Sequence, residues 1–172
     1  MTPSVPFAER RVIRMNKSAK KVKICLASSS GGHFEQLMML KPLIKKYNGY
    51  VVTEKNEYDI KVDNIPVKYV MPINRTDKAF VLKFLCNIIK SFFIIIANKP
   101  DFIISTGALA AVPLMIWTKI FGGKVIYIES FAKINSPNIS GKIAYKFAYQ
   151  FYVQWESMKK FYPNAIYKGG IY

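Results

Sequence analysis

The sequence predicts a single α/β domain built around a doubly wound parallel sheet. Short apolar runs alternate with segments of helical periodicity along most of the chain, and glycine or proline separates them. Strands that alternate with helices form a parallel sheet that is covered on both faces. The 172 residues, of which 51% are hydrophobic and 15% aromatic, suffice for one domain with a sizeable core and exclude a disordered chain.

The domain is expected over residues 21–172, after a basic leader over residues 1–20. The leader, MTPSVPFAERRVIRMNKSAK, has no apolar core and therefore does not resemble a secretory signal. Its basic side chains could contact anionic lipid, or it could be a flexible extension ahead of a natural start at Met15. We favour the second interpretation.

The predicted strands are short and bounded by glycine, proline or polar residues. In chain order they are Val22–Ser28, Tyr50–Thr53, Val67–Met71, Phe102–Ser105, Lys124–Glu129 and Gln150–Gln154. The segments between them carry apolar residues three and four positions apart, which predicts helices. These helices are Phe34–Tyr47, which Pro42 should kink, Ala79–Ala97, Ala108–Phe121 and Ser140–Phe147.

The helix expected over Ala79–Ala97 is unusually apolar. A helix needs about 20 consecutive apolar residues to span a bilayer, and Lys83, Asn87 and Lys90 interrupt this run. Lys83 and Lys90 lie two helical turns apart on one face, and Asn87 extends their polar stripe. The pattern suits an interfacial helix whose lysines reach towards lipid headgroups, or a core helix with one solvated face, rather than a transmembrane helix.

The charge is strongly unbalanced, with 26 Lys and Arg against 10 Asp and Glu and a net charge of +16. Such a surface suits nucleic acid, a phosphate-bearing substrate or an anionic membrane. The basic residues are scattered among Ile, Phe and Tyr and do not form blocks with interleaved aromatic residues, as in proteins that bind single strands. The pattern therefore favours a membrane surface and argues against nucleic acid.

The two cysteines, Cys25 and Cys86, lie in apolar runs without the spacing of metal ligands. They are most simply buried thiols in a reducing compartment. No metal site is therefore expected.

A turn of small residues follows the first predicted strand. Ser30, Gly31 and Gly32 lie beyond its carboxyl end, which is where doubly wound sheets bind ligands. Glycines let a backbone approach a ligand and point N–H groups at a phosphate, which the start of a helix also favours. His33, the chain's only histidine, comes next and is the best available general base near neutral pH. A tight turn and a histidine without a role explain these residues equally well on their own.

Two later strands end in the same way. Thr106 and Gly107 follow the strand that ends at Ser105, and a helix comes after them. Glu129 ends another apolar strand and begins a polar tract that runs to Ser140. Because the carboxyl ends of parallel strands meet at one edge of a sheet, these groups could grip one ligand. Glu129 could instead serve as a helix cap or an ion-pair partner.

Taken together, several segments resemble the polysaccharide-biosynthesis glycosyltransferase subunits of the CpsF/PssD type. The segments are SSSGGH, ISTGALAAVP, VIYIESFAKINSPNISGKIAY, FYVQWE and YPNAIYKGGIY, and they cover about residues 21–172. Those proteins are similar to the membrane-recruiting subunit of the eukaryotic dolichol-linked N-acetylglucosaminyltransferase. More remotely, the motif order resembles the acceptor half of MurG-like glycosyltransferases. The sequence departs from the eukaryotic subunit because it has no clear N-terminal transmembrane helix.

The resemblance implies the Rossmann-like N-terminal half of a GT-B glycosyltransferase for capsular or exopolysaccharide synthesis. A separate nucleotide-sugar-binding subunit would hold the donor, so this chain would bind no cofactor. The acceptor would be a polyprenyl-diphosphate saccharide at the cytoplasmic face of an anionic membrane. A non-catalytic membrane recruiter and, less well, a self-sufficient nucleotide-binding enzyme are the alternatives.

The expected site residues fall into four groups. His33 or Glu129 would be the catalytic base, and the acceptor diphosphate would lie against Ser30, Gly31, Gly32, Thr106 and Gly107. Lys83 and Lys90 would contact the membrane. The partner subunit would cover the C-terminal segment at Gly169, Gly170 and Tyr172.

Overall fold

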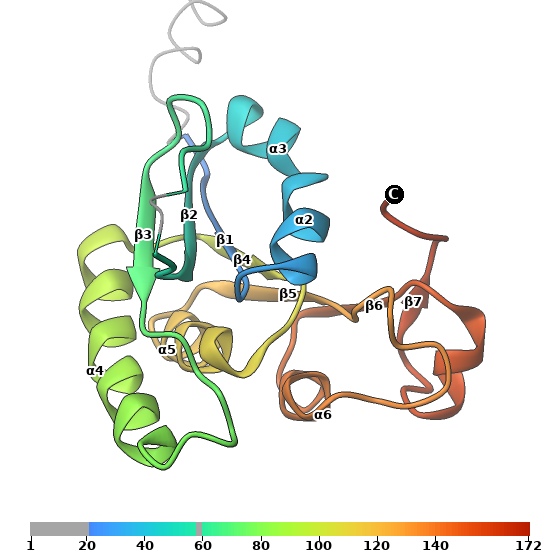
Figure 1. Cartoon of the computed structure of the whole chain (residues 1–172). Coiled ribbons are helices and arrows are strands. Elements are labelled where there is room, and N and C mark those ends of the chain that lie inside the picture. The colour runs from blue at the N-terminus through green and yellow to red at the C-terminus, as the bar shows by residue number, and fades with distance from the viewer. Residues whose placement is uncertain (1–20, 58–59) are drawn as a thin grey trace, which may run out of the picture.

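A computed structural model describes residues 21–57 and 60–172 of the chain. The predicted leader over residues 1–20 lies outside the described residues. Within them, seven strands form one parallel sheet in the order β3-β2-β1-β4-β5-β6-β7 (Figure 1). This is the strand order of the doubly wound nucleotide-binding folds, with a seventh strand added at one edge. The predicted α/β doubly wound parallel sheet is confirmed.

The strands follow the predicted apolar runs closely. Their bounds are β1 Lys23–Ala27, β2 Asn48–Glu54, β3 Val67–Val70, β4 Phe102–Ser105, β5 Lys124–Ile128, β6 Gln150–Val153 and β7 Ile166–Tyr167. Strand β7 was not predicted, because a strand of two residues carries no periodicity.

The helices differ from the prediction mainly in the first crossover. The predicted helix Phe34–Tyr47 is divided into α2, Gly32–Met38, and α3, Lys41–Lys46. Pro42 lies in the first turn of α3, where a missing N–H costs little, so the chain breaks before it instead of bending at it. The other helices are α4 Phe80–Asn98, α5 Val112–Ile120 after a 3₁₀ turn Leu109–Ala111, α6 Ile139–Tyr145, and a 3₁₀ helix Glu156–Lys160.

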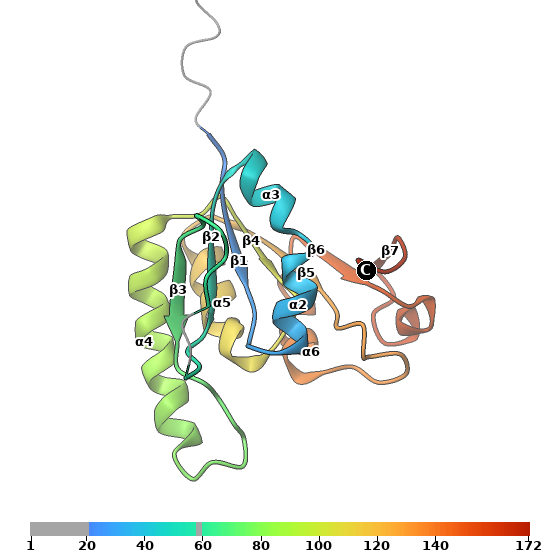
Figure 2. The same cartoon turned by 45° about the horizontal axis from the view of Figure 1, so that its top comes forward.

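Helices cover both faces of the sheet (Figures 1 and 2). On one face, α4, α5 and α6 bury side chains such as Cys25, Tyr50 and Tyr127. On the other, α2 and α3 bury Ile24, Leu26 and Val51. Alternate residues of each strand point to opposite faces, so both cores follow from the uninterrupted apolar runs.

The orientation of α4 corrects the predicted polar stripe. Asn87 is fully buried, and its side chain bonds the backbone of Met71 with Met71 N to Oδ1 at 2.7 Å and Nδ2 to Met71 O at 2.8 Å. Asn87 therefore does not extend a solvated face, and that expectation is wrong. Lys83 is half-buried and pairs with Asp77, while Lys90 is exposed.

The apolar residues of α4 point outward instead. The large exposed side chains are Val81, Leu82, Leu85, Ile89, Phe93 and Ile96. Neighbouring α5 adds Ile116 and Ile120, with Phe121 directly after it. By length and composition α4 could cross a membrane, since its mean hydropathy is 2.1 and only 17% of it is buried. Its buried polar side packs on the domain, however, and the exposed apolar side is left without a protein partner among the described residues.

Candidate functional site

The candidate site lies at the carboxyl ends of β1 and β4. These strands are neighbours at the point where the strand order reverses, which is the ligand-binding position of doubly wound sheets. The turn after β1 contains Gly31, at φ 75°, and the turn after β4 contains Gly107, at φ 118°. The structure thus brings the two predicted small-residue turns side by side.

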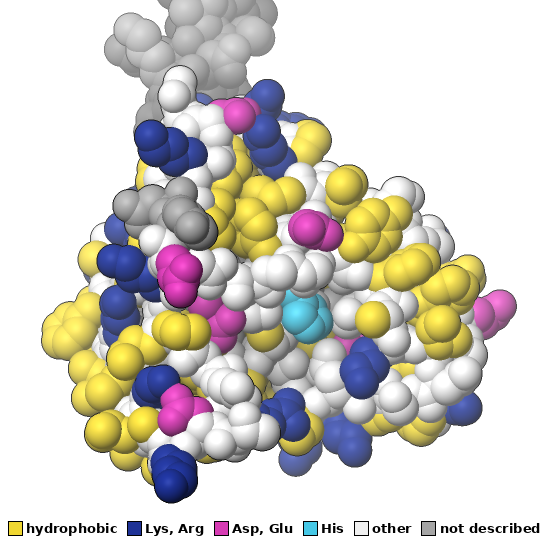
Figure 3. All heavy atoms as spheres, viewed as in Figure 1, with side chains coloured by type: hydrophobic (Ala, Val, Ile, Leu, Met, Phe, Trp, Pro, Cys, Tyr) yellow, Lys and Arg dark blue, Asp and Glu magenta, His cyan; other side chains and the backbone are white. Residues whose placement is uncertain are grey.

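His33 and Thr106 connect these turns through two reciprocal hydrogen bonds. His33 Nδ1 lies 2.9 Å from Thr106 O, and the Thr106 hydroxyl donates to His33 O over 2.7 Å. A carbonyl oxygen can only accept, so Nδ1 carries a proton, and in the neutral ring the lone pair is therefore on Nε2. The ring is half-buried, and Figure 3 shows this histidine at the molecular surface between neighbouring elements. His33 therefore presents a basic nitrogen to the site.

Thr106 itself is fully buried. Its hydroxyl donates to His33 O, so its side chain helps to orient the histidine. That Thr106 also lines the acceptor diphosphate stays a prediction.

Gly107 makes room for the imidazole. A Cβ at this position would lie 3.1 Å from His33 Cε1 and 3.1 Å from the Tyr127 hydroxyl. Its φ is also one that L side chains rarely adopt. A side chain here would press on His33 and strain the backbone, so this position favours glycine.

Glu129 follows β5 and is fully buried. Its carboxylate accepts from Ser130 N at 2.9 Å, from the Tyr162 hydroxyl at 2.8 Å, and from the Asn138 side-chain amide. Burial raises the pKa of Glu129, while the hydrogen bonds and the nearby His33 counteract this in part. The enclosed carboxylate anchors the polar tract, because Asn138 in turn caps α6. Of the two expected bases, the geometry favours His33.

A second buried carboxylate, Glu54, was missed in the sequence. It ends β2 and is 7% exposed. Oε2 accepts from Ser30 N at 3.3 Å and from Ser30 Oγ at 3.4 Å, and Oε1 accepts from Ile73 N at 2.9 Å. The available signal was the run YVVTE, in which an acid ends an apolar strand, as Glu129 does after VIYI.

The C-terminal segment packs against the polar tract that follows Glu129. Ile171 N donates to the Gln154 side chain at 3.0 Å, and Gln154 Nε2 donates to Glu129 O at 2.9 Å. The Tyr172 ring lies edge-on to Phe131, with ring centres 5.2 Å apart, yet 62% of Tyr172 stays exposed. Gly169 and Gly170 lie between this contact and β7, and Gly169 is half-buried while Gly170 is exposed.

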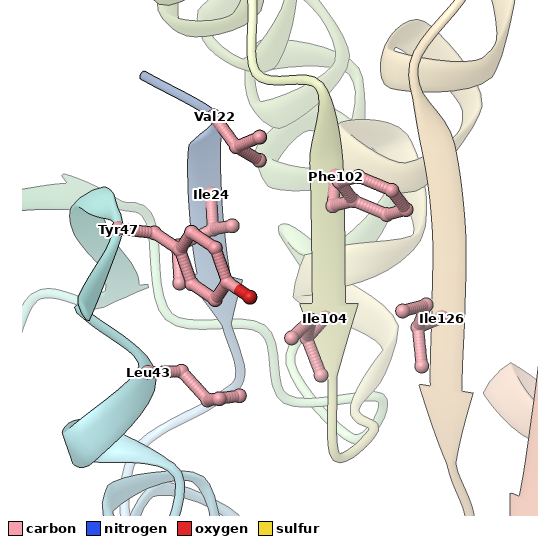
Figure 4. A pocket seen from close by; sticks show the side chains of 7 residues that line it. All are labelled: Val22, Ile24, Leu43, Tyr47, Phe102, Ile104 and Ile126. Carbon is pink, nitrogen blue, oxygen red and sulfur yellow. The ribbon is translucent and has the colours of Figure 1, made fainter. Parts of the chain in front are cut away.

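An apolar groove opens on the sheet face that carries α2 and α3. It has a volume of about 260 Å³ and lies between α3 and the strands β1, β4 and β5 (Figure 4). Its lining is formed by Val22, Ile24, Leu43, Tyr47, Phe102, Ile104 and Ile126. A second, mainly apolar hollow of about 210 Å³ continues along β5 and β6 to Ile171. This face of the sheet is therefore only partly covered by the described residues.

Across residues 21–57 and 60–172, no three His, Cys, Asp or Glu side chains lie close enough to hold a metal ion. Cys25 is buried and Cys86 half-buried, and both are free thiols. Burial raises the pKa of Cys25 to about 12. Neither cysteine lies at the candidate site.

Comparison with known proteins identifies related sequences over nearly the whole chain. The family model described as "Oligosaccharide biosynthesis protein Alg14 like" matches residues 24–171. The human UDP-N-acetylglucosamine transferase subunit ALG14 is 26% identical over 181 residues, which is 88% of this chain and 84% of that protein. The same subunit from Saccharomyces cerevisiae is 26% identical over 88% of this chain and 77% of its own length.

Solved structures share the fold at low sequence identity. Acinetobacter baumannii MurG superimposes with a TM-score of 0.61 at 14% identity, over 79% of this chain and 42% of that one. A UDP-N-acetylglucosamine 2-epimerase from Rickettsia bellii reaches a TM-score of 0.68 at 13% identity, over 88% of this chain and 45% of that one. The chain thus spans less than half the length of these solved chains. The likeness confirms the predicted Rossmann-like domain of the GT-B type.

Proposed function

Because the chain belongs to the Alg14-like family of oligosaccharide biosynthesis proteins, we propose that it is the acceptor-binding subunit of a two-component glycosyltransferase. The observation that carries this proposal is His33, which lies between two glycine turns at the switch point of the sheet and whose Nε2 has no hydrogen-bond partner among the described residues. Relatives named as subunits of a UDP-N-acetylglucosamine transferase support the division into two chains and make that nucleotide sugar the first donor to test.

The proposed acceptor is a polyprenyl-diphosphate saccharide. Its diphosphate would lie against Ser30, Gly31, Gly32 and Gly107. The backbone N–H of Ser30 donates to Glu54 and that of Gly107 to Ser105 Oγ, so the N–H groups left for the diphosphate would be those of Gly31 and Gly32 at the start of α2. His33 Nε2 would take the proton from the attacking hydroxyl as its oxygen bonds to the donor sugar's anomeric carbon. The bond from that carbon to the nucleotide phosphate breaks at the same time, so the nucleoside diphosphate leaves with the bonding electrons. Glu129 would hold the polar tract in place beside this site.

The partner subunit would bind the nucleotide sugar and close over the carboxyl edge of the sheet. Two features support docking at the C-terminal side: the exposed ring of Tyr172 beside Gly169 and Gly170, and the apolar face that runs from the groove to Ile171. An incompletely covered sheet face favours an apolar protein surface over solvent. We assign the partner subunit as its occupant.

The membrane contact would be peripheral. The apolar side of α4 and the end of α5 would enter the interfacial region, while Lys90 and Lys83 flank it and attract anionic headgroups. The proposed location is the cytoplasmic face of a membrane. Capsular or exopolysaccharide synthesis, as in the bacterial CpsF/PssD type, is the proposed setting.

The second candidate is a non-catalytic recruiter that only brings a transferase to the membrane. The exposed apolar side of α4 on a chain of net charge +16 favours it, because neither feature requires chemistry. The two functions differ in what they need from His33.

Replacement of His33 by Ala in the reconstituted pair separates them. A catalytic base typically contributes about 100-fold or more to turnover, so His33→Ala should lower the rate by that factor while partner binding stays unchanged. His33→Gln, which keeps a polar side chain of similar length, is the matched control for lost packing and should be equally slow. Full activity of both variants in detergent would remove His33 from catalysis and favour the recruiter.

A further inference from the structure

Hydrogen bonds, joined by the backbone between Met71 and Ile73, connect the exposed apolar helix α4 to the turn proposed to bind the diphosphate. The side-chain amide of Asn87, in the middle of α4, accepts from the backbone N–H of Met71 and donates to its backbone oxygen. Met71 comes directly after β3. Two residues further on, Ile73 N donates to Glu54 Oε1 at 2.9 Å. The other oxygen of Glu54 accepts from the backbone and hydroxyl of Ser30.

We propose that Glu54 is a positioning residue that joins the Ser30 turn to the β3–α4 connection, and that Asn87 extends this link to α4. The inference rests on the proposed function. Together the two residues would fix the diphosphate site at a set height above the membrane surface in which α4 lies. A lipid-linked diphosphate is itself held at the headgroup level, so only one height allows it to enter the turn.

The chemistry at Glu54 requires a carboxylate. Two backbone N–H groups from different loops point at the same side chain, and only a carboxylate offers an accepting oxygen to each. Glutamine would turn an NH₂ group towards either Ser30 N or Ile73 N and so lose one of the two bonds. Aspartate would be too short by one methylene to reach both.

The chemistry at Asn87 is equally specific. Its amide donates to one backbone group of Met71 and accepts from the other, which a carboxylate or an apolar side chain of the same size cannot do. Ser91, one turn further along α4, is also fully buried, but its hydroxyl has no hydrogen-bond partner among the described residues. Ser91→Ala is therefore a matched control on the same side of the same helix.

The test compares two acceptors in the reconstituted pair. One is a long-chain polyprenyl-diphosphate saccharide in anionic vesicles, and the other is its water-soluble analogue with a short prenyl chain. The readout is the ratio of kcat/KM for the vesicle acceptor to kcat/KM for the soluble acceptor. This ratio does not depend on the fraction of folded enzyme, so a merely destabilising substitution leaves it unchanged.

Asn87→Ala should lower the ratio about tenfold, because a small displacement of the diphosphate turn relative to the membrane affects only the acceptor that the membrane holds. Ser91→Ala should leave the ratio at the wild-type value. Glu54→Gln disturbs the turn itself, so it should raise KM about tenfold for both acceptors with kcat little changed. An unchanged ratio in Asn87→Ala, or an unchanged KM in Glu54→Gln, would overturn the proposal.

Amide hydrogen exchange on this chain alone tests the link without activity. In Glu54→Gln, residues 29–32 and residues 73–75 should both exchange about tenfold faster, because both lose the same anchor. Faster exchange in only one segment, or in neither, would show that Glu54 does not join them. If the wild-type pair transfers sugar to neither acceptor, the proposed function is wrong, and the exchange measurement still decides on the link.

Discussion

The imidazole of His33 is fixed by its neighbours and not by its own backbone alone. Thr106 holds both ends of the residue, the ring through Nδ1 and the backbone through its hydroxyl. The other ring nitrogen is left as the base that the proposed transfer needs. The proposed function therefore depends on the tautomer of His33.

The chain has one histidine, so ¹⁵N NMR of the imidazole reports on His33 without assignment ambiguity. In the neutral ring we expect the proton on Nδ1 and a bare Nε2. Thr106→Val removes the hydroxyl that holds the His33 backbone and should give a mixture of tautomers, whereas Thr106→Ser should keep the wild-type spectrum. A wild-type ring protonated on Nε2 would contradict the proposed base.

Glu129 should make stability depend on pH in an unusual direction. Burial raises its pKa, so its contribution to stability is complete below the pKa of an unfolded glutamate, about 4.3, and is lost as the pH rises through the raised value. Glu129→Gln removes this titration. Measured by urea unfolding, the stability of the variant relative to the wild type should therefore increase with pH across that window.

The exposed Glu156→Gln supplies the baseline for this comparison. A difference between Glu129→Gln and wild type that stays constant with pH, or that changes in the opposite direction, would show that the carboxylate is not destabilised by burial.

At the scale of elements, α4 is the helix whose role is hardest to predict from the sequence. Its composition fits both an interfacial helix and a core helix. The structure combines them, since the buried side is polar at Asn87 and Ser91 and the exposed side is apolar. Periodicity identifies two faces of a helix but does not say which one is buried, because that depends on partners distant in the sequence, here the backbone of Met71.

The apolar side of α4 should decide membrane binding. Ile89 and Phe93 are 59% and 62% exposed, and burial of such a side chain contributes about 1.5–3 kcal/mol. Ile89→Glu with Phe93→Glu should weaken binding to anionic vesicles by about 100-fold or more in a flotation assay. Ile139→Glu, which changes an exposed isoleucine on α6, is the matched control.

The lysines should contribute less and in a salt-dependent way. The double substitution Lys83→Glu and Lys90→Glu should weaken binding to anionic vesicles at low salt, because each basic residue contributes about 1 kcal/mol near such a surface. Part of the effect of Lys83 will be the loss of its pair with Asp77. Equal binding to neutral and anionic vesicles would contradict an electrostatic contribution.

The remaining elements show where sequence reasoning succeeds. Strands β1, β4 and β5 were predicted to within one residue at each end, because uninterrupted apolar runs that stop at Ser, Gly or Glu are distinctive of buried parallel strands. Their turns, and His33 between them, followed from the same rule. The role of Glu54 could not be predicted in this way, because its hydrogen-bond partners Ser30 and Ile73 lie 24 and 19 residues away in the sequence.

At the scale of the whole molecule, the C-terminal segment links the sheet edge to the polar tract. Deletion of residues 169–172 removes the Ile171 bond to Gln154 and the Tyr172 contact with Phe131. It should weaken the complex with the partner subunit in a pull-down or titration, and the isolated domain should remain folded. Unchanged partner affinity would show that the interface does not include residues 169–172.

Under the proposed function, the domain supplies one wall of an active site. Its fold matches less than half of each solved chain with which it was compared. The groove beside α3 and the hollow beside Ile171 leave one sheet face partly open. Both features are expected of a chain that works as part of a pair.

The most direct test mixes purified chain, a lipid-diphosphate saccharide and a panel of nucleotide sugars that includes UDP-N-acetylglucosamine, with and without the partner subunit. We expect no transfer by this chain alone, transfer when the partner is added, and loss of that transfer in His33→Ala. Sugar transfer by this chain without a partner would contradict the two-component account.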